Sequence, residues 1–419
     1  DTRSWANVRG GALVVDKVVA ALYTVGLRHP LSVIAVMCVG LAAGASQVGN
    51  VVVETNLQEF FDPTHPIRQD TRHIDEKLVG TIPVAVMFDT ATRGGLKNLE
   101  VLRQIRAFQS WIEQQPEVDR SIGQTDFIED MHWAFHAENP EFRKLPDDER
   151  LISQYLLIYD GEDLYDFVDR DFQHSFVALN LNVHSANEIA AVLERIRGYL
   201  SEHIGESVEW EIAGVGRLFA DMEDLLIAGQ VYSLWGALAL IFVFILLFLR
   251  SLPAAALCMI PNLSPIFLIF VIMGGTGIWL DMATAMIASV AIGIAVDDTL
   301  HVYHGFQQRM KRGASPVLAL LRTYHGAGRA VVTTTVILGA QFMILTASDF
   351  IPTRNFGLLT TAGLIAALLF DLLLLPALLI IFHGPNSPVA QWLSSRKRPQ
   401  EAASAAHLGG HDPGLDASY

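Results

Sequence analysis

Six long apolar runs limit the folds open to this chain more than any other feature of its sequence. A bilayer core about 30 Å thick is crossed by about 20 apolar residues in a helix. An open chain crosses it only as a helix, because lipid leaves no partners for backbone polar groups. The sequence therefore predicts a polytopic α-helical membrane protein with one span followed, after a large insert, by five. The predicted spans are residues 31–48, 227–249, 254–275, 283–305, 330–347 and 356–382.

Lys and Arg gather at one end of all six predicted spans. They lie before the first span, at Arg250, throughout the stretch 307–329, and at 396–398 after the last span. Short loops rich in Lys and Arg stay on the cytoplasmic side of a membrane. We therefore expect cytoplasmic termini and an opposite, outer location for the large segment 49–226.

The two ends of the chain carry further expectations. Residues 1–30 include an apolar stretch interrupted by Asp16 and Lys17, which predicts an amphipathic juxtamembrane helix on the cytoplasmic surface. The tail 383–419 is polar and predicted to be disordered. The chain begins without an initiator methionine or a signal peptide, so we expect a piece of something longer.

The large outer segment has the pattern of an α/β domain. Helical spacing of apolar residues marks "LKNLEVLRQIRAFQSWIEQQ" and "SANEIAAVLERIRGYLSEH", with Ser185 as the N-cap of the second helix. Strands are predicted in "TIPVAVMFDT", "VDRSIGQTD", "HSFVALNLNV" and "SVEWEIAGV". This order gives β-α-β twice, the split ferredoxin-like pattern, with a polar helical insertion at about 126–170.

Composition excludes some partners and favours one compartment. The net charge of −15 comes without any basic stripe, which argues against nucleic-acid binding. Both cysteines, Cys38 and Cys258, lie in apolar runs and predict neither a disulfide nor a metal site. The outer segment has no cysteine and no N-x-Ser/Thr glycosylation sequence, which favours a bacterial periplasm and therefore the inner membrane. No cofactor is predicted.

Two adjacent acids, Asp297 and Asp298, lie in the fourth predicted span, in "IASVAIGIAVDDTLHVYHGF". A carboxylate there costs about 2.5–3.5 kcal/mol on insertion scales, which marks it as a candidate for function. Small residues in the same stripe would let another helix approach, so we expect Asp297 to face a protein neighbour. The stripe recurs every four residues, at Ala285, Ser289, Gly293, Asp297 and His301.

Reversible protonation is the chemistry that this pair suits best. Hydrocarbon surroundings and an adjacent like charge both favour the neutral form of one carboxyl group. His301, one turn away, could pass the proton onward, which predicts a relay of Asp297, Asp298 and His301. Three further residues could join it. They are Asp371 in the sixth span, Thr334 among the threonines at 333–335, and His304.

Two other chemistries use the same residues. Asp297, His301 and His304 could hold a metal ion, but no further strong ligand is in view, so no metal site is predicted. Intramembrane aspartyl proteolysis would need two carboxylates converging from different helices, with Asp371 as the second. Sequence neighbours point apart on a helix, so the pair at 297 and 298 cannot do this alone. No nucleophile constellation or phosphate loop supports any other enzyme.

The stretch "GIAVDDTLH", with its flanks "MIPNLSPIFLIFVIMGGTGIWLDMATA" and "GRAVVTTTVILGAQFMILTASDFIPTRNFGLL", resembles the resistance-nodulation-division (RND) superfamily. The nearest branch is that of MMPL-type predicted lipid exporters, whose membrane domain resembles a sterol-sensing domain. The resemblance implies a secondary transporter driven by proton influx, with Asp297 and Asp298 as relay carboxylates. Such proteins usually have two six-span halves. This chain has one, and no lysine lies in its spans. It therefore resembles the C-terminal half and needs a second half or subunit.

The resemblance also implies a cargo class. Its lipid-exporter branch moves hydrophobic or amphiphilic molecules such as hopanoids, sterols and other envelope lipids, in some cases with periplasmic or outer-membrane partner proteins. Trp133 and Phe135 are weak candidates for lining a lipid path, and an acidic outer face would favour cationic amphiphiles. The alternative is a lipid-sensing or scaffold protein that keeps the fold without pumping. Such a protein would tolerate Asp297→Asn, whereas a pump would not.

Overall fold

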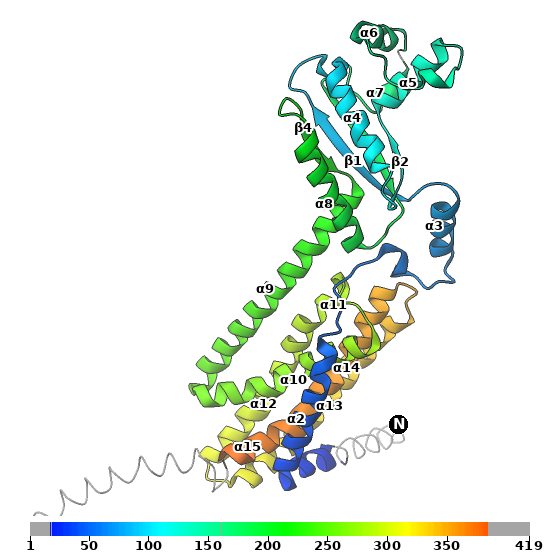
Figure 1. Cartoon of the computed structure of the whole chain (residues 1–419). Coiled ribbons are helices and arrows are strands. Elements are labelled where there is room, and N and C mark those ends of the chain that lie inside the picture. The colour runs from blue at the N-terminus through cyan, green and yellow to red at the C-terminus, as the bar shows by residue number, and fades with distance from the viewer. Residues whose placement is uncertain (1–16, 18, 160, 384–419) are drawn as a thin grey trace, which may run out of the picture.

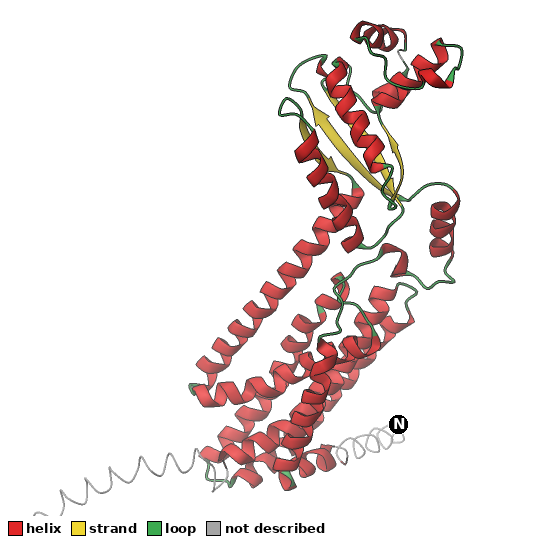
Figure 2. Ribbon diagram, in the orientation of Figure 1, coloured by secondary structure: helices red, strands yellow, loops and turns green. Residues whose placement is uncertain are grey.

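A computed structural model of the chain describes residues 17, 19–159 and 161–383. The predicted tail and the first part of the predicted juxtamembrane helix lie outside the described residues. The described chain forms a helical bundle with a small sheet domain at one end (Figure 1). Figure 2 shows that the strands are confined to that domain. The chain is therefore a polytopic membrane protein with a 1+5 arrangement of six candidate spans.

The six candidate spans are built from ten helical elements, of which the long helix α9 runs without a break from the sheet domain to the far end of the bundle (Figure 1). The fourth span is made of α11 and α12, the fifth of α13 and a 3-10 turn (Leu345–Ala347), and the last of α14, a π-helical turn and α15. The bounds are α2 (Pro30–Val48), α9 (Val215–Leu249), α10 (Leu252–Thr276), α11 (Met282–Ala285), α12 (Ile287–Lys311), α13 (Pro316–Ile344), α14 (Ile351–Leu369), the π turn (Phe370–Leu374) and α15 (Leu375–His383).

Two helices begin well before the spans predicted for them. Helix α9 begins at Val215 rather than at 227, and α13 begins at Pro316 rather than at 330. The predicted basic loop at 307–329 is therefore largely helical, with α12 and α13 joined only through residues 312–315. Hydropathy identifies only the apolar part of a helix, whereas the helical hydrogen bonds of the backbone extend beyond it to the capping residue. Here that cap is Ser315, whose hydroxyl accepts from the Leu318 amide at 3.4 Å.

A short apolar helix, Val19–Arg28, precedes the first span. Val19 and Tyr23 are buried, and the Tyr23 ring stacks on Tyr324 of α13 with centroids 5.4 Å apart. Gly26 packs so closely that an added Cβ would lie 2.7 Å from the Leu373 carbonyl oxygen. This helix therefore packs against the bundle, rather than only lying along a membrane surface as its amphipathic pattern predicts.

The sheet domain contains the four strands and two helices predicted for it. All neighbouring strands are antiparallel, in the order β2-β3-β1-β4. Ser185 caps the second helix by accepting from the Glu188 amide at 3.2 Å, as predicted. The elements are β1 (Ile82–Asp89), α4 (Leu99–Ile112), β2 (Val118–Ile122), β3 (His174–Leu181), α8 (Ala186–His203) and β4 (Glu209–Ala213).

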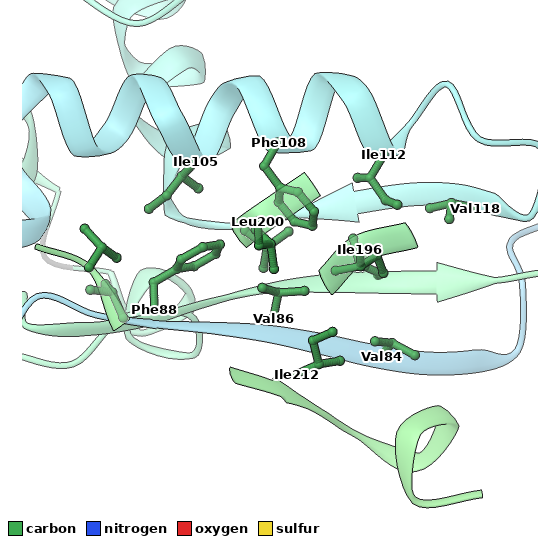
Figure 3. Close-up of a cluster of buried hydrophobic side chains, with 14 of the residues drawn as sticks. Val84, Val86, Phe88, Ile105, Phe108, Ile112, Val118, Ile196, Leu200 and Ile212 are labelled. Carbon is green, nitrogen blue, oxygen red and sulfur yellow. The ribbon is translucent and has the colours of Figure 1, made fainter. Parts of the chain in front are cut away.

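One face of the sheet forms the domain core. Side chains alternate along β1, so Val84, Val86 and Phe88 all point to the same side. They meet Phe108 and its neighbours on α4, as Figure 3 shows. Burial of such side chains contributes roughly 1.5–3 kcal/mol each before the entropy cost of ordering them. The start of α9 joins this core through Phe219 and Ala220.

Two helical segments extend the domain. The predicted insertion forms α5 (Gln124–Phe135), α6 (Glu149–Ile158) and α7 (Glu162–Tyr165) at the end farthest from the bundle (Figure 1). A 3-10 turn, Leu57–Phe60, and α3 (Pro66–Lys77) lie between α2 and β1, where no element was predicted. A side chain caps the start of each element. Asn56 Oδ1 accepts a hydrogen bond from the Gln58 amide, and His65 Nδ1 accepts one from the Ile67 amide.

Candidate functional site

A group of polar side chains lies inside the bundle, where four spans meet. Asp371 in the π turn is 2% exposed, and the Thr299 hydroxyl of α12 donates to its Oδ1 at 2.6 Å. Thr299 Oγ1 also lies 3.4 Å from Asn262 Oδ1 of α10, and the Tyr324 hydroxyl of α13 donates to the Asp371 carbonyl at 2.6 Å. We call Asn262, Thr299, Tyr324 and Asp371 the buried polar cluster.

The π turn explains why Asp371 can take part with its backbone as well as its side chain. The Leu375 amide bonds to the Phe370 carbonyl, five residues back, so it does not bond to Asp371 as it would in an α-helix. Pro376 has no amide hydrogen to donate. The Asp371 carbonyl is therefore left without a helical partner, and the Tyr324 hydroxyl satisfies it. Turns of this kind are frequent at functional sites.

The two adjacent aspartates lie in different surroundings. The side chain of Asp297 is 78% exposed, and its nearest ionisable contact is His301 Nε2 at 3.5 Å on the same face of α12. Asp298 is half-buried, about 100° around the helix, and directly precedes Thr299 of the buried polar cluster. The structure thus brings Asp297 together with His301, and Asp298 toward the buried polar cluster.

At Gly293 the small-residue stripe is not covered by another helix of the described chain, whereas the Ser289 hydroxyl is buried. A Cβ added to Gly293 would meet nothing within 4 Å. Ala285 ends α11, and Met286 separates it from α12, so the four-residue repeat does not begin within one helix. The neighbour expected beside Asp297 therefore does not come from the described part of this chain.

The other predicted members of the relay lie apart from Asp371. His304 is exposed, with its ring 5.5 Å from Phe248 of α9 and its Nε2 3.0 Å from the Gln308 amide nitrogen. Thr334 is exposed and donates to carbonyls of its own helix. The threonine that bonds Asp371 is Thr299 of α12 instead.

Sequence reasoning missed Thr299 and Asn262, although both left a signal. Thr299 directly follows Asp298, which turns it a further 100° from Asp297 and toward the bundle. Asn262 is a polar side chain between Pro261 and Pro265 in an otherwise apolar span. A polar residue inside a span is a candidate for function whatever its charge.

The weak cargo candidates lie at the far tip of the sheet domain. Phe135 is 57% exposed and stacks on Tyr155 with centroids 5.2 Å apart. The Arg143 guanidinium lies 5.5 Å from the centre of the Trp133 ring. Neither aromatic belongs to the domain core, and both are separated from the bundle by the sheet.

The arrangement suits proton exchange better than metal chemistry. Within residues 17–383 that are described, no three His, Cys, Asp or Glu side chains gather as a metal ion would require. The Asp371 carboxyl contacts a neutral hydroxyl, and an uncompensated charge in such a place is costly. A carboxyl group held in this way can carry a proton and change its hydrogen bonds when it does.

Thr299→Val is expected to destabilise the bundle by about 1–3 kcal/mol, because it leaves the buried Asp371 carboxyl without its donor. The measurement is thermal unfolding of the purified protein in detergent. Thr334→Val is the matched control, since Thr334 is exposed and bonds only its own helix. Equal loss in both variants would mean that the bond at Thr299 contributes nothing specific.

Comparison with known proteins adds an independent line of evidence. The model of the MMPL family matches residues 166–404, more than half of the chain. The chain is 25% identical over 206 residues to a membrane protein of Methanocaldococcus jannaschii, a stretch covering 48% of this chain and 53% of that protein. It is 29% identical over 203 residues to the multidrug resistance protein MdtC of Pectobacterium atrosepticum, covering 47% and 19%. It is 26% identical over 141 residues to the membrane protein ActII-3 of Streptomyces coelicolor, covering 31% and 20%. The matches span about half the length of the first relative and about a fifth of the other two.

Proposed function

Because this chain belongs to the MMPL family of the RND superfamily, we propose that it is one six-span half of an exporter driven by inward proton movement. The observation that carries the proposal is the Asp371 carboxyl, buried inside the bundle and held by the Thr299 hydroxyl at 2.6 Å. A carboxyl group buried in a span destabilises the protein, so its presence there indicates a function, and proton transfer is the function we propose. The multidrug resistance proteins among its relatives support export as the activity.

The proposed proton path includes the face of α12 that points away from the bundle. Asp297 and His301 take up or release the proton there, and Asp298 lies between Asp297 and Thr299 around the helix. A change of charge at Asp371 would alter its bond to Thr299, and so the fit of α12 against the π turn. Protonation would thereby change how these helices pack, and a coupled transporter requires such a conformational response.

The proposed partner is a second six-span half or a second subunit, seated on the uncovered stripe of α12. Gly293 leaves room for a close helix, and Asp297 would gain protein surroundings in place of lipid. Helix α9, next to α12, also has an exposed apolar face that includes Trp235, Leu240 and Leu247.

We place the sheet domain in the periplasm and the termini in the cytoplasm of a bacterial inner membrane. The clusters of Lys and Arg at one end of the spans support this orientation. The domain is proposed to be ferredoxin-like, since two β-α-β units with strand order β2-β3-β1-β4 have that topology. Such a domain would guide cargo onward, with periplasmic or outer-membrane partners receiving it.

The proposed cargo is a hydrophobic or amphiphilic molecule, with envelope lipids such as hopanoids or sterols as the leading class. The test is proton flux. Protein purified from its own membranes is reconstituted into liposomes that contain a pH-sensitive dye, a pH gradient is imposed, and a fluorescently labelled lipid serves as cargo. We expect the gradient to collapse faster with cargo than without it. A gradient that decays at the rate of empty liposomes would contradict the pump and favour the lipid-sensing alternative.

A further inference from the structure

A cavity of about 260 Å³ lies where the segment between α2 and β1 crosses the end of the bundle. Its walls come from three places in the sequence: this segment, the connection between α10 and α11, and the start of α14. The residues that matter for the argument are Glu54, Thr55, Glu59, Phe60, Trp279 and Asp281. None of them belongs to the buried polar cluster.

Main-chain hydrogen bonds hold two of these walls together. The Leu280 amide donates to the Val52 carbonyl at 2.8 Å, and the Glu54 amide donates to the Leu280 carbonyl at 3.3 Å. Asp281 caps α11 by accepting from the Thr284 amide at 2.7 Å. The cavity is therefore a built feature of the junction between sheet domain and bundle.

The cavity has acidic walls, and two oxygens of its lining residues are buried without a partner in the described residues. Glu54 Oε2 accepts from Ser185 and Asn187 at 2.9 and 2.8 Å, whereas its Oε1 is buried with no hydrogen-bond partner in the described residues. Thr55 is 1% exposed, and its hydroxyl likewise has no partner among the described atoms. A buried oxygen without a hydrogen-bond partner is unfavourable, so both atoms would be stabilised by a donor beside them.

The nearby cations are already engaged. Arg354 also lines the cavity, but its guanidinium donates to Asp62 at 2.9 Å. Glu59 lies 3.7 Å from Arg68. Within the described part of the chain, no Lys, Arg or His lies within 4 Å of the carboxylates of Glu54 and Asp281. The cavity therefore presents excess negative charge beside polar acceptors.

Two aromatic rings line the same space. Trp279 and Phe60 both line the cavity, and the face of an aromatic ring attracts a cation. The acids do not gather closely enough for a metal ion among the described residues, so an organic cation fits better. The volume falls just below the usual range of about 300–1,000 Å³ for small-molecule sites, which suits a head group rather than a whole lipid.

We infer that this cavity binds an alkylammonium group, most simply the charged head of an amphiphile whose tail lies along the bundle. Trp279 lies three residues after the end of α10, a candidate span, and aromatic side chains at such ends mark the membrane interface. The site deepens the proposed function by naming the charge of the cargo head. Its role in transport rests on that proposal, whereas binding itself does not.

The test is calorimetric titration of the purified full chain with choline and with 3,3-dimethyl-1-butanol, its uncharged isostere. We expect saturable choline binding and at least about tenfold weaker binding of the isostere. Glu54→Gln should weaken choline binding about tenfold, and Trp279→Leu more than Trp279→Phe. Glu206→Gln, an exposed acid elsewhere on the sheet domain, is the control and should change nothing.

The source of the cation is tested by repeating the titration in nanodiscs of phosphatidylglycerol with and without phosphatidylethanolamine. If phosphatidylethanolamine in the nanodisc weakens choline binding, the result supports an amphiphile as the ligand. If choline binds equally well with and without this lipid, the site is assigned to a free small amine. Equal binding of choline and its isostere, or unchanged binding by folded Glu54→Gln protein, would overturn the site. No pH gradient is used, so intact choline binding without cargo-dependent proton flux would count against the pump alone.

Discussion

Asp297→Asn is expected to abolish cargo-dependent proton flux while leaving the protein folded. Loss of a proton-transfer group typically costs about a hundredfold or more in rate. The side chain is 78% exposed in this chain, and its nearest ionisable contact is His301 at 3.5 Å, so stability should change by no more than about 0.5 kcal/mol. The measurements are the liposome flux described above and the unfolding temperature of the same preparation.

Two matched variants sharpen that result. Asp297→Glu keeps the carboxyl group and should retain part of the flux. Asp70→Asn removes an exposed acid from α3 and should retain all of it. Full flux in Asp297→Asn would contradict the relay. Together with retained lipid binding, it would favour the sensing or scaffold alternative.

Gly274→Ala is expected to disrupt the bundle at the contact between α2 and α10. A Cβ at this position would lie 1.8 Å from the carbonyl oxygen of Gln47. That oxygen belongs to the backbone at the end of α2, so the two helices must separate to relieve the overlap. Overpacking of this kind costs about 1–3 kcal/mol and occasionally more. We expect folded protein to be lost at a lower temperature, measured by size-exclusion chromatography after heating.

The adjacent residue provides the control for this substitution. Gly275→Ala places its Cβ in open space, with nothing within 4 Å. Both changes gain the same helix propensity, about 0.8–1.0 kcal/mol, so their difference isolates the steric contact. Equal unfolding temperatures would mean that α2 does not pack on α10 as closely as the structure has it.

Much of the architecture could be predicted because it depends on local sequence pattern. Each span is recognisable from about 20 apolar residues, since the bilayer forces the backbone to bond within its own helix. Alternation along β1 and β3 predicts their buried faces, because strand side chains have a period of two. Helix ends such as those of α9 and α13 were less predictable, because the backbone ladder continues past the apolar residues until a cap ends it.

The candidate site divides in the same way. Asp297, Asp298 and Asp371 were recognisable from the sequence, because an acid inside an apolar run is costly wherever the helix packs. The bond between Thr299 and Asp371 joins residues 72 positions apart, and the cavity at Glu54 and Trp279 joins three distant segments. Such contacts depend on how the helices pack and on the π turn, which leaves the Asp371 carbonyl without a helical hydrogen bond. The spacing of residues in the sequence predicts neither. The sequence by itself determined which groups must be accounted for, and the tertiary structure decided which of them meet.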